Sequence, residues 1–278
     1  MNGTAIPLQR WQADFAAAVS LAIELDFEGP QPCHFGAPRA RSAPLVVGDF
    51  SGEVAQGASC NCRQITLVPH CNGTHTEGVG HLVAGPTLPL HRVVPAGPMP
   101  ALLLSVTPVQ VPAAARRTAC GDDTDPPPRP GDRLVTSALL RAAWPRTLAV
   151  APLALILRTL PNDEARRRRD HSGGNPPYLS RQAVQWLVER GIEHLVLDLP
   201  SLDRSDDAGR LTGHRLFFGL PPGATQATLA TRPAATITEF AFIPPEVADG
   251  PCALQLQLPA FTGDAVPSRP LLLPLREA

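Results

Sequence analysis

Hydrophobic and polar positions define three elements in the second half of the chain. The apolar run over Leu148 to Thr159 predicts a central strand. Ser180 then caps a predicted helix with apolar residues at helical spacing, and this helix ends at Gly191. Ile192 to Leu199 follows as a second predicted strand. A helix that leads into an apolar strand is typical of α/β proteins, so we expect this fold class.

The beginning of the chain has a helical pattern of its own. Trp11, Phe15, Val19 and Ile23 are spaced four residues apart within Leu8 to Leu25. This spacing predicts an amphipathic helix, or a helix that leads into a strand. We expect this helix and the one that begins at Ser180 to pack against a mixed sheet.

Short apolar segments predict the remaining strands. Ile65 to Val68 and Ala101 to Val111 are bounded by prolines and are consistent with buried strands. Thr236 to Leu275 alternates apolar and polar residues between prolines, which favours antiparallel strands. Ala113 to Asp132 is rich in Pro, Arg and Asp and predicts an exposed excursion. There is no internal repeat or domain-sized linker, so we expect one domain over residues 1–278.

The composition is typical of a globular enzyme, with 44% hydrophobic and 18% charged residues. The formal net charge of −1 gives no general attraction to nucleic acid or to anionic lipid. The run from Arg166 to Arg169 is interpreted as a solvated segment rather than a nucleic-acid-binding patch. All 24 basic residues are arginine, which excludes Schiff-base chemistry and lysine-dependent phosphate loops.

The expected location is the cytoplasm, without a membrane partner. No apolar run approaches the roughly 20 residues that span a bilayer, and the first ten residues do not resemble a secretory signal. Six cysteines are too few for a disulfide scaffold in a chain of this length.

One segment concentrates residues that can bind a metal. Twelve consecutive residues hold three histidines, one glutamate and one cysteine: His70, Cys71, His75, Glu77 and His81. His75 and Glu77 are two residues apart, so on a strand both side chains leave the same face. Imidazole nitrogen and carboxylate oxygen form a ligand set suited to zinc or manganese.

Two later segments offer further ligands. His214 follows the stretch from Asp198 to Asp203, and Glu239 lies in an otherwise uncharged, largely apolar run. A carboxylate in such a run is costly to bury unless it is paired or bound to a metal, which favours Glu239 as a ligand. The sequence has no Gly-x-Ser-x-Gly motif for a serine nucleophile of the α/β-hydrolase kind.

The segment Asn72-Gly73-Thr74-His75-Thr76-Glu77, with His81, resembles a family motif. It is similar to His-x-Gly-Thr-His-x-Asp-x-x-x-His of the putative cyclase family, which includes bacterial kynurenine formamidase and isatin hydrolase. The similarity extends to Gly48–Phe50, Arg158–Asn162, Pro177–Ser180, Asp198–Asp203, His214–Arg215 and Glu239–Gly250. The resemblance implies a kynurenine formamidase-like single domain of the swivelling β/β/α type, with a mixed sheet flanked by helices.

The resemblance also implies roles for individual residues. His75 and Glu77 match metal ligands of the motif, and His214 and Glu239 match the later ligands that complete the site. His81 matches the third motif histidine, which implies proton transfer next to the metal. The cofactor implied is a divalent metal, with zinc expected first and manganese as the alternative.

Two departures from the motif leave the ligand set open. The first motif histidine should lie four residues before His75, where this chain has Cys71, and His70 is one residue further back. Either His70 is a ligand, or Cys71 provides a thiolate, or neither does. Glu77 replaces the usual aspartate, which lengthens the side chain by one methylene.

The activity implied is hydrolysis of a small amide or lactam by metal-activated water, as in an arylformamidase, with His81 as the general base. The family usually forms dimers or larger assemblies, so a homodimer or homotetramer is expected. One alternative is a catalytically altered member that only binds a small carboxylic acid. Another is a non-enzymatic module in which Cys60, Cys62, His70 and Cys71 hold a structural zinc ion.

Overall fold

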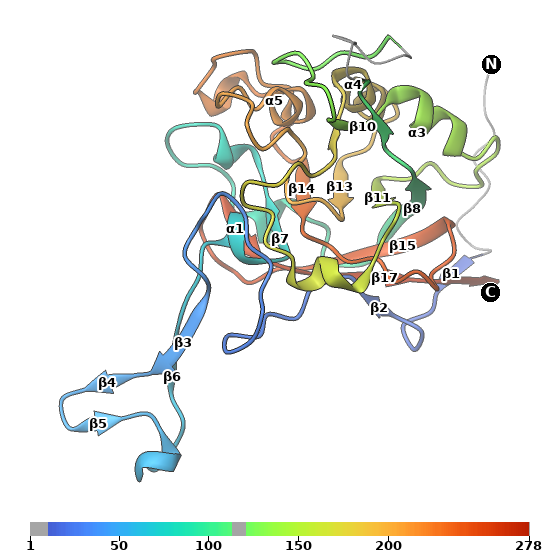
Figure 1. The fold of residues 1–278 in the computed structure, drawn as a ribbon. Helices are drawn as coiled ribbons and strands as arrows, with labels where there is room; N and C mark the ends of the chain where they lie inside the picture. Colours follow the sequence, from blue (N-terminus) through green and yellow to red (C-terminus); the bar gives the residue numbers. More distant parts are fainter. Residues whose placement is uncertain (1–10, 113–120, 278) are drawn as a thin grey trace.

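The chain folds around one large mixed sheet that curls along its length (Figure 1). This computed structural model describes residues 11–112 and 121–277. The strand order in the nine-stranded sheet is β16-β7-β14-β13-β11-β8-β15-β17-β2. In that order the strands are Ala265–Pro267, His75–Glu77, Thr236–Glu239, His194–Leu197, Ala154–Thr159, Met99–Val106, Gly250–Gln257, Arg269–Leu273 and Val19–Ser20. The four central strands β14, β13, β11 and β8 are parallel, and the strands on both sides of them pair antiparallel.

Strict alternation along the central strands gives the sheet two buried faces. On β11, Leu155 and Leu157 belong to one apolar cluster and Ala154 and Ile156 to another. This follows from the period of two along a strand, and continuous apolar runs are expected where both faces are covered. The predicted strands over Leu148 to Thr159 and Ile192 to Leu199 correspond to β11 and β13.

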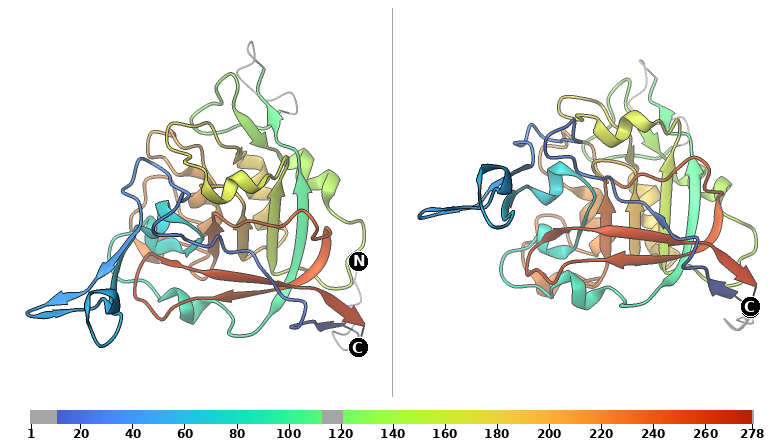
Figure 2. Two further views of the ribbon diagram at one scale, coloured as in Figure 1. Left: turned by 60° about the horizontal axis from the view of Figure 1, so that its bottom comes forward. Right: turned by 90° about the horizontal axis from the view of Figure 1, so that it is seen from below.

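Three helices cover one face of the sheet (Figure 1): α3 Ser137–Ala143, α4 Arg181–Glu189 and α5 Thr212–Phe218. The hydroxyl of Ser180 accepts a hydrogen bond from the N–H of Ala183, so the predicted cap of α4 is correct. The predicted α/β class and the mixed sheet flanked by helices are therefore confirmed. On the other face, β15 and β17 lie across the parallel strands (Figure 2).

The remaining elements are short. The other helices are α1 Pro69–Asn72 and α2 Leu90–Val93, with 3₁₀ turns at Val54–Gln56, Val79–His81, Glu164–Arg168 and Ala227–Leu229. The other strands are β1 Trp11–Ala13, β3 Arg41–Pro44, β4 Val46–Val47, β5 Phe50–Ser51, β6 Arg63–Thr66, β9 Val109–Gln110, β10 Arg133–Val135, β12 Tyr178–Leu179 and β18 Leu275–Glu277. No helix within the described ranges is long and apolar enough to cross a membrane.

Residues 41–66 form an arm that projects from the body in all three views (Figures 1 and 2). Its stem is the antiparallel pair β3 and β6, and its outer part is the pair β4 and β5. Ile65 is 55% exposed, so the prediction of a buried strand over Ile65 to Val68 is wrong. That segment pairs with only one other strand and lies outside the core.

The predicted N-terminal helix is also wrong. Over the described part of Leu8 to Leu25 the chain instead forms β1, which pairs with β18, and β2, which pairs with β17. Phe15 is 60% exposed, whereas Leu21 and Ile23 are buried, so the buried positions follow a period of two. Pairing with strands from the far end of the chain overrides the local helical spacing.

The predicted excursion over Ala113 to Asp132 falls partly outside the described residues, which resume at Gly121. From there the segment is attached to the body rather than freely exposed. Asp122 is buried and accepts hydrogen bonds from the N–H of Ser137 and the hydroxyl of Ser180. Asp132 is buried and accepts a hydrogen bond from the hydroxyl of Tyr178.

The run of four arginines after β11 is not uniformly solvated, which corrects the sequence-based interpretation. Arg166 is buried and its Nη1 lies 2.6 Å from Oδ2 of Asp198, at the end of β13. Burial raises the pKa of Asp198 to about 6, against the opposing effect of the Arg166 guanidinium. The ion pair thus joins the ends of two central strands.

Arg166→Met is expected to lower the free energy of unfolding by about 3–5 kcal/mol at pH 8, because it leaves a buried carboxylate without its cation. The loss should be smaller at pH 5. Without Arg166 the pKa of folded Asp198 rises further, so protonation removes the unpaired charge as the pH falls. Urea unfolding at both pH values measures the effect. Arg168→Met, at an exposed position, is the control; equal losses at both pH values would contradict the charge-based explanation.

Candidate functional site

The register of β7 and β14 brings three candidate ligands to one face of the sheet. Glu239 is directly opposite His75, and Ile237 is opposite Glu77. Because opposite residues in an antiparallel pair share a face, His75, Glu77 and Glu239 lie together. On the other face, the hydroxyls of Thr76 and Thr238 are 2.7 Å apart.

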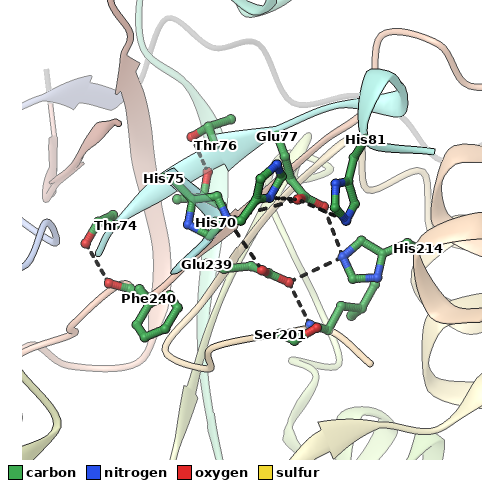
Figure 3. Close-up of polar contacts among 12 residues, drawn as sticks. His70, Thr74, His75, Thr76, Glu77, His81, Ser201, His214, Glu239 and Phe240 are labelled. Carbon is green, nitrogen blue, oxygen red and sulfur yellow. Dashed lines mark hydrogen bonds and ion pairs between the residues drawn. The ribbon is translucent and has the colours of Figure 1, made fainter. Parts of the chain in front are cut away.

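The side chains of these three residues point toward one another (Figure 3). Nε2 of His75 is 3.6 Å from Oε2 of Glu239 and 4.0 Å from Oε2 of Glu77. All three residues are buried, with exposures of 0% for His75, 0% for Glu77 and 3% for Glu239. The N–H of Leu202 donates a hydrogen bond of 2.7 Å to Oε1 of Glu239 and fixes that carboxylate.

His214 approaches the same carboxylates from α5. Its Nε2 is 2.9 Å from Oε1 of Glu77 and 3.5 Å from Oε1 of Glu239. Its Nδ1 donates to Oδ2 of Asp203 at 2.7 Å, and Asp203 also accepts from the N–H groups of Gly213 and His214. A Cβ at Gly213 would lie 2.8 Å from Oδ1 of Asp203, so this close approach requires glycine. Asp203 thereby orients the ring so that Nε2 faces the cluster.

His75 is held in one tautomer by the backbone. Its Nδ1 is 3.0 Å from the carbonyl oxygen of Gly73, which can only accept, so Nδ1 carries the proton. Burial lowers the pKa of His75 to about 4, so the ring is neutral. Its Nε2 lone pair is then buried against carboxylate oxygens without a hydrogen-bond partner among the described residues. A lone pair that faces anionic oxygens is unfavourable unless a cation lies between them.

His70 reaches the cluster from the single turn of α1. Its Nδ1 is 2.9 Å from Oε2 of Glu77 and its Nε2 is 2.8 Å from Oδ2 of Asp264. Burial lowers the pKa of His70, but the contacts with both carboxylates outweigh burial and raise it to about 9. Cys71 is buried, and no cysteine belongs to the potential metal-binding groups formed by the described residues.

His81 lies at the rim of the cluster, after the chain turns at Gly78 and Gly80. Its side chain is 25% exposed, with Nε2 4.0 Å from Oε2 of Glu77 and Nδ1 3.8 Å from Oδ2 of Asp264. Burial and the neighbouring imidazoles of His214 and His70 lower the pKa of His81, against the opposing charge of Glu77. A neutral imidazole at an accessible rim can accept a proton.

The two buried glutamates have opposite electrostatic surroundings. Burial raises the pKa of Glu77, but the imidazoles of His214 and His70 outweigh burial and hold it well below its usual value. At Glu239, burial and the charge of Glu77 act in the same direction and raise the pKa. A cation between the two carboxylates would relieve the repulsion that Glu77 exerts on Glu239.

The residues present fit a divalent metal ion. Two atoms that bind one zinc ion at about 2.0–2.2 Å lie about 3–4 Å apart. The distances given above between the imidazole nitrogens and carboxylate oxygens of the cluster are close to this range. Three overlapping groups have ligand atoms within 4.8 Å of one another: His70, His75 and Glu77; Glu77, His81 and His214; His70, His81 and Asp264. Five of the six residues singled out from the sequence belong to these groups. Glu239 belongs to none of them, but it lies 3.6 Å from His75 and 3.5 Å from His214.

Two carboxylates of the site were not predicted from the sequence. Asp264 contacts both His70 and His81, but it comes from the loop before β16 and had no motif around it. Asp203 lay in a segment already noted, eleven residues before His214. Cys60 and Cys62 lie on the projecting arm, and neither belongs to the three groups formed by the described residues, which gives no support to a structural cysteine zinc site.

Residues 11–204 match the family described as "Putative cyclase". No curated protein matches the sequence significantly. Among solved structures, the chain is similar to a predicted metal-dependent hydrolase from Bacillus stearothermophilus, with a TM-score of 0.57, 16% identity and coverage of 92% of this chain and 97% of that one. It is also similar to isatin hydrolase A from Labrenzia aggregata, with a TM-score of 0.58, 16% identity and coverage of 92% and 93%. Isatin hydrolase A from Ralstonia solanacearum gives a TM-score of 0.54, 16% identity and coverage of 92% and 91%.

Proposed function

This chain belongs to the putative cyclase family, and we propose from that premise that it is a metal-dependent hydrolase. Its substrate is a small amide or cyclic amide, and the bond cleaved is a carbon–nitrogen bond outside peptides. The metal is zinc or manganese. We further propose that the protein is located in the cytoplasm and forms a homo-oligomer. A measurement of its mass in solution would test the oligomeric state.

The observation that supports this proposal most strongly is the unpaired Nε2 of His75. That lone pair is buried between Glu77 and Glu239 and cannot be satisfied by either carboxylate. His214 presents a second oriented nitrogen to the same oxygens. In the proposed site, His75, Glu77, His214 and Glu239 hold the ion, and His70 is a further ligand on the side of Asp264.

When bound, a divalent ion at this position would polarise the substrate carbonyl and acidify an attacking water. The residues at the rim then handle the protons. His81 accepts the proton of the attacking water and later delivers it to the leaving nitrogen as the C–N bond breaks. The products are a carboxylate and an amine. Oδ2 of Asp264, 3.8 Å from Nδ1 of His81, stabilises the imidazolium that forms between the two transfers by its negative charge.

An activity screen with metal-loaded protein tests this function. The panel contains formanilide as an aryl formamide, isatin as a cyclic amide and a simple lactone, each assayed with zinc and with manganese. We expect turnover of at least one amide, and loss of turnover when a chelator removes the metal. Tight binding of carboxylic acids without turnover of any amide or lactam would instead support a catalytically altered family member.

A further inference from the structure

The projecting arm, residues 41–66, carries apolar side chains that the described part of the body does not cover. Val46 is 67% exposed and Val47 is 63% exposed, and Phe50 on the neighbouring strand is exposed as well. Val47 is directly opposite Phe50 in the pair of β4 and β5, so these two side chains share one face. Single exposed apolar residues are normal on a protein surface, but a continuous group of them indicates a binding surface.

The backbone of the arm is also weakly supported. Within the described residues, β3 pairs only with β6, and β4 pairs only with β5. An isolated two-stranded pair is marginally stable in water, and its outer edges keep N–H and C=O groups that can bond to another strand. The arm extends away from the curled sheet in every view (Figures 1 and 2). Stabilisation of its outer part therefore requires a contact outside its own chain.

A groove of about 920 Å³ lies where the arm leaves the body. Ser42, Arg63 and Ile65 line it from the arm, and Phe27 and Arg168 are among the residues that line it from the body. Phe27 is half-buried, so part of its ring stays accessible there. A water molecule takes about 30 Å³ in the liquid, so a groove of this size has room for several side chains.

The groove and the tip of the arm carry opposite charges. Arg167 and Arg168 line the body side of the groove, and Arg168 is exposed. Asp49, in the turn between β4 and β5, is exposed at the tip. An exposed pair of this kind contributes little to affinity, but it favours one orientation of the two surfaces.

The position of the groove, directly at the base of the arm, favours a second copy of this chain as the occupant. Two copies related by a two-fold axis can place their arms side by side in opposite directions, so that the tip of each arm reaches the groove of the other. Both tips and both grooves are then covered, and the assembly closes as a dimer. Residues 41–66 also match the roughly 20–30 residues that each partner gives to a stable interface.

We propose that the tip of the arm, residues 46–51, binds the groove of a second copy and so forms a two-fold symmetric dimer. The inference rests on the homo-oligomer of the proposed function and gives that oligomer its interface. In this dimer Val47 and Phe50 lie against the partner's Phe27, and Asp49 faces the partner's Arg168. Each subunit both gives an arm and receives one.

The mass of the protein in solution, measured by analytical ultracentrifugation over a range of concentrations, tests the dimer. Wild-type protein should have twice the 29.5 kDa of one chain. The tip variant, Val47→Asp with Phe50→Asp, should raise the Kd of the dimer at least about 100-fold, because charges replace buried apolar side chains in both contacts. Phe15→Asp is the matched control. Phe15 is 60% exposed but lies on the body, so the dimer should persist.

A mixing experiment distinguishes the exchange of arms from a simple contact between two arms. The groove variant, Phe27→Asp with Ile65→Asp, keeps its tip and should also be a monomer. An equimolar mixture of tip variant and groove variant should form a dimer, because the intact tip of one still meets the intact groove of the other. Circular dichroism checks the fold of every variant. If Phe27→Asp prevents folding, Ile65→Asp alone is the groove variant, since Ile65 is exposed.

The possible outcomes separate this inference from the proposed function. A dimer that persists in the tip variant or in the groove variant would overturn the inference and leave the proposed homo-oligomer intact. A monomeric wild type would overturn both, without affecting the proposed hydrolysis, because the mass requires no turnover. A monomeric wild type that binds lipid vesicles only while Val47 and Phe50 are present would assign the arm to a membrane surface instead.

Discussion

Glu239→Gln is expected to lower metal affinity by at least about 100-fold while the fold remains intact. Loss of a residue that merely orients a ligand already lowers metal affinity by about 10- to 100-fold, and Glu239 is proposed as a ligand itself. The amide oxygen can still accept the hydrogen bond from Leu202, so the local backbone should not change. His75→Ala should have the same effect because Nε2 of His75 is a buried nitrogen of the cluster without a hydrogen-bond partner among the described residues. Activity should fall in parallel.

Metal content measured by mass spectrometry in zinc- and manganese-buffered solutions checks this result, with circular dichroism as the test of folding. His194→Gln is a matched control. His194 is also a buried histidine on the same sheet, but its Nδ1 is 2.8 Å from the hydroxyl of Thr236 and it lies outside the cluster. Full metal occupancy in both Glu239→Gln and His75→Ala would remove the proposed site.

His81→Ala is expected to lower kcat by about 10²- to 10⁴-fold, the usual contribution of general acid–base catalysis. Metal content should stay near that of the wild type because His81 is not among the residues proposed to hold the ion and its side chain is partly exposed, 4.0 Å from Glu77. These two results together distinguish a proton-transfer residue from a ligand. Loss of the metal in His81→Ala would make His81 a ligand, and wild-type turnover would exclude its role in proton transfer.

The pH dependence of kcat/KM gives a second measurement for His81. Only the neutral imidazole can accept a proton, so activity should rise with pH through the pKa of His81 and then level off. Burial and the neighbouring imidazoles lower this pKa, so the rising limb should lie at a lower pH than that of an ordinary histidine. The limb should flatten in His81→Ala. A water acidified by the metal can titrate in the same region, so the comparison with the variant is essential.

The sequence predicted the parts of the site that local spacing determines. His75 and Glu77 alternate along one strand, and the isolated carboxylate of Glu239 in an apolar run signalled an unusual environment. Asp264 could not be found in this way, because its contact with His70 depends on where the loop before β16 lies in space. Nor could the sequence identify which of four consecutive arginines is buried. That choice depends on Asp198, which directly follows β13, about 30 residues later in the chain.

The same limit explains the error at the beginning of the chain. Residues spaced four apart can form one side of a helix, but the strands β1 and β2 obtain their hydrogen bonds from β18 and β17. Such pairing between the two ends of a chain leaves no mark in a local pattern. The helix α4 and the strand that follows it were predicted correctly because their signals are local: a serine cap with helical spacing, and a continuous apolar run.

The position of β7 has a consequence for the synthesis of the protein. Its two neighbours in the sheet, β14 and β16, are both much later in the chain. During translation, His75 and Glu77 therefore emerge long before either neighbouring strand exists, and both edges of β7 stay unpaired. Pairings of such long sequence separation form slowly, and unpaired strand edges favour aggregation. Ribosome-bound chains that end before Thr236 should thus be unable to build the cluster, whatever metal the surrounding solution contains.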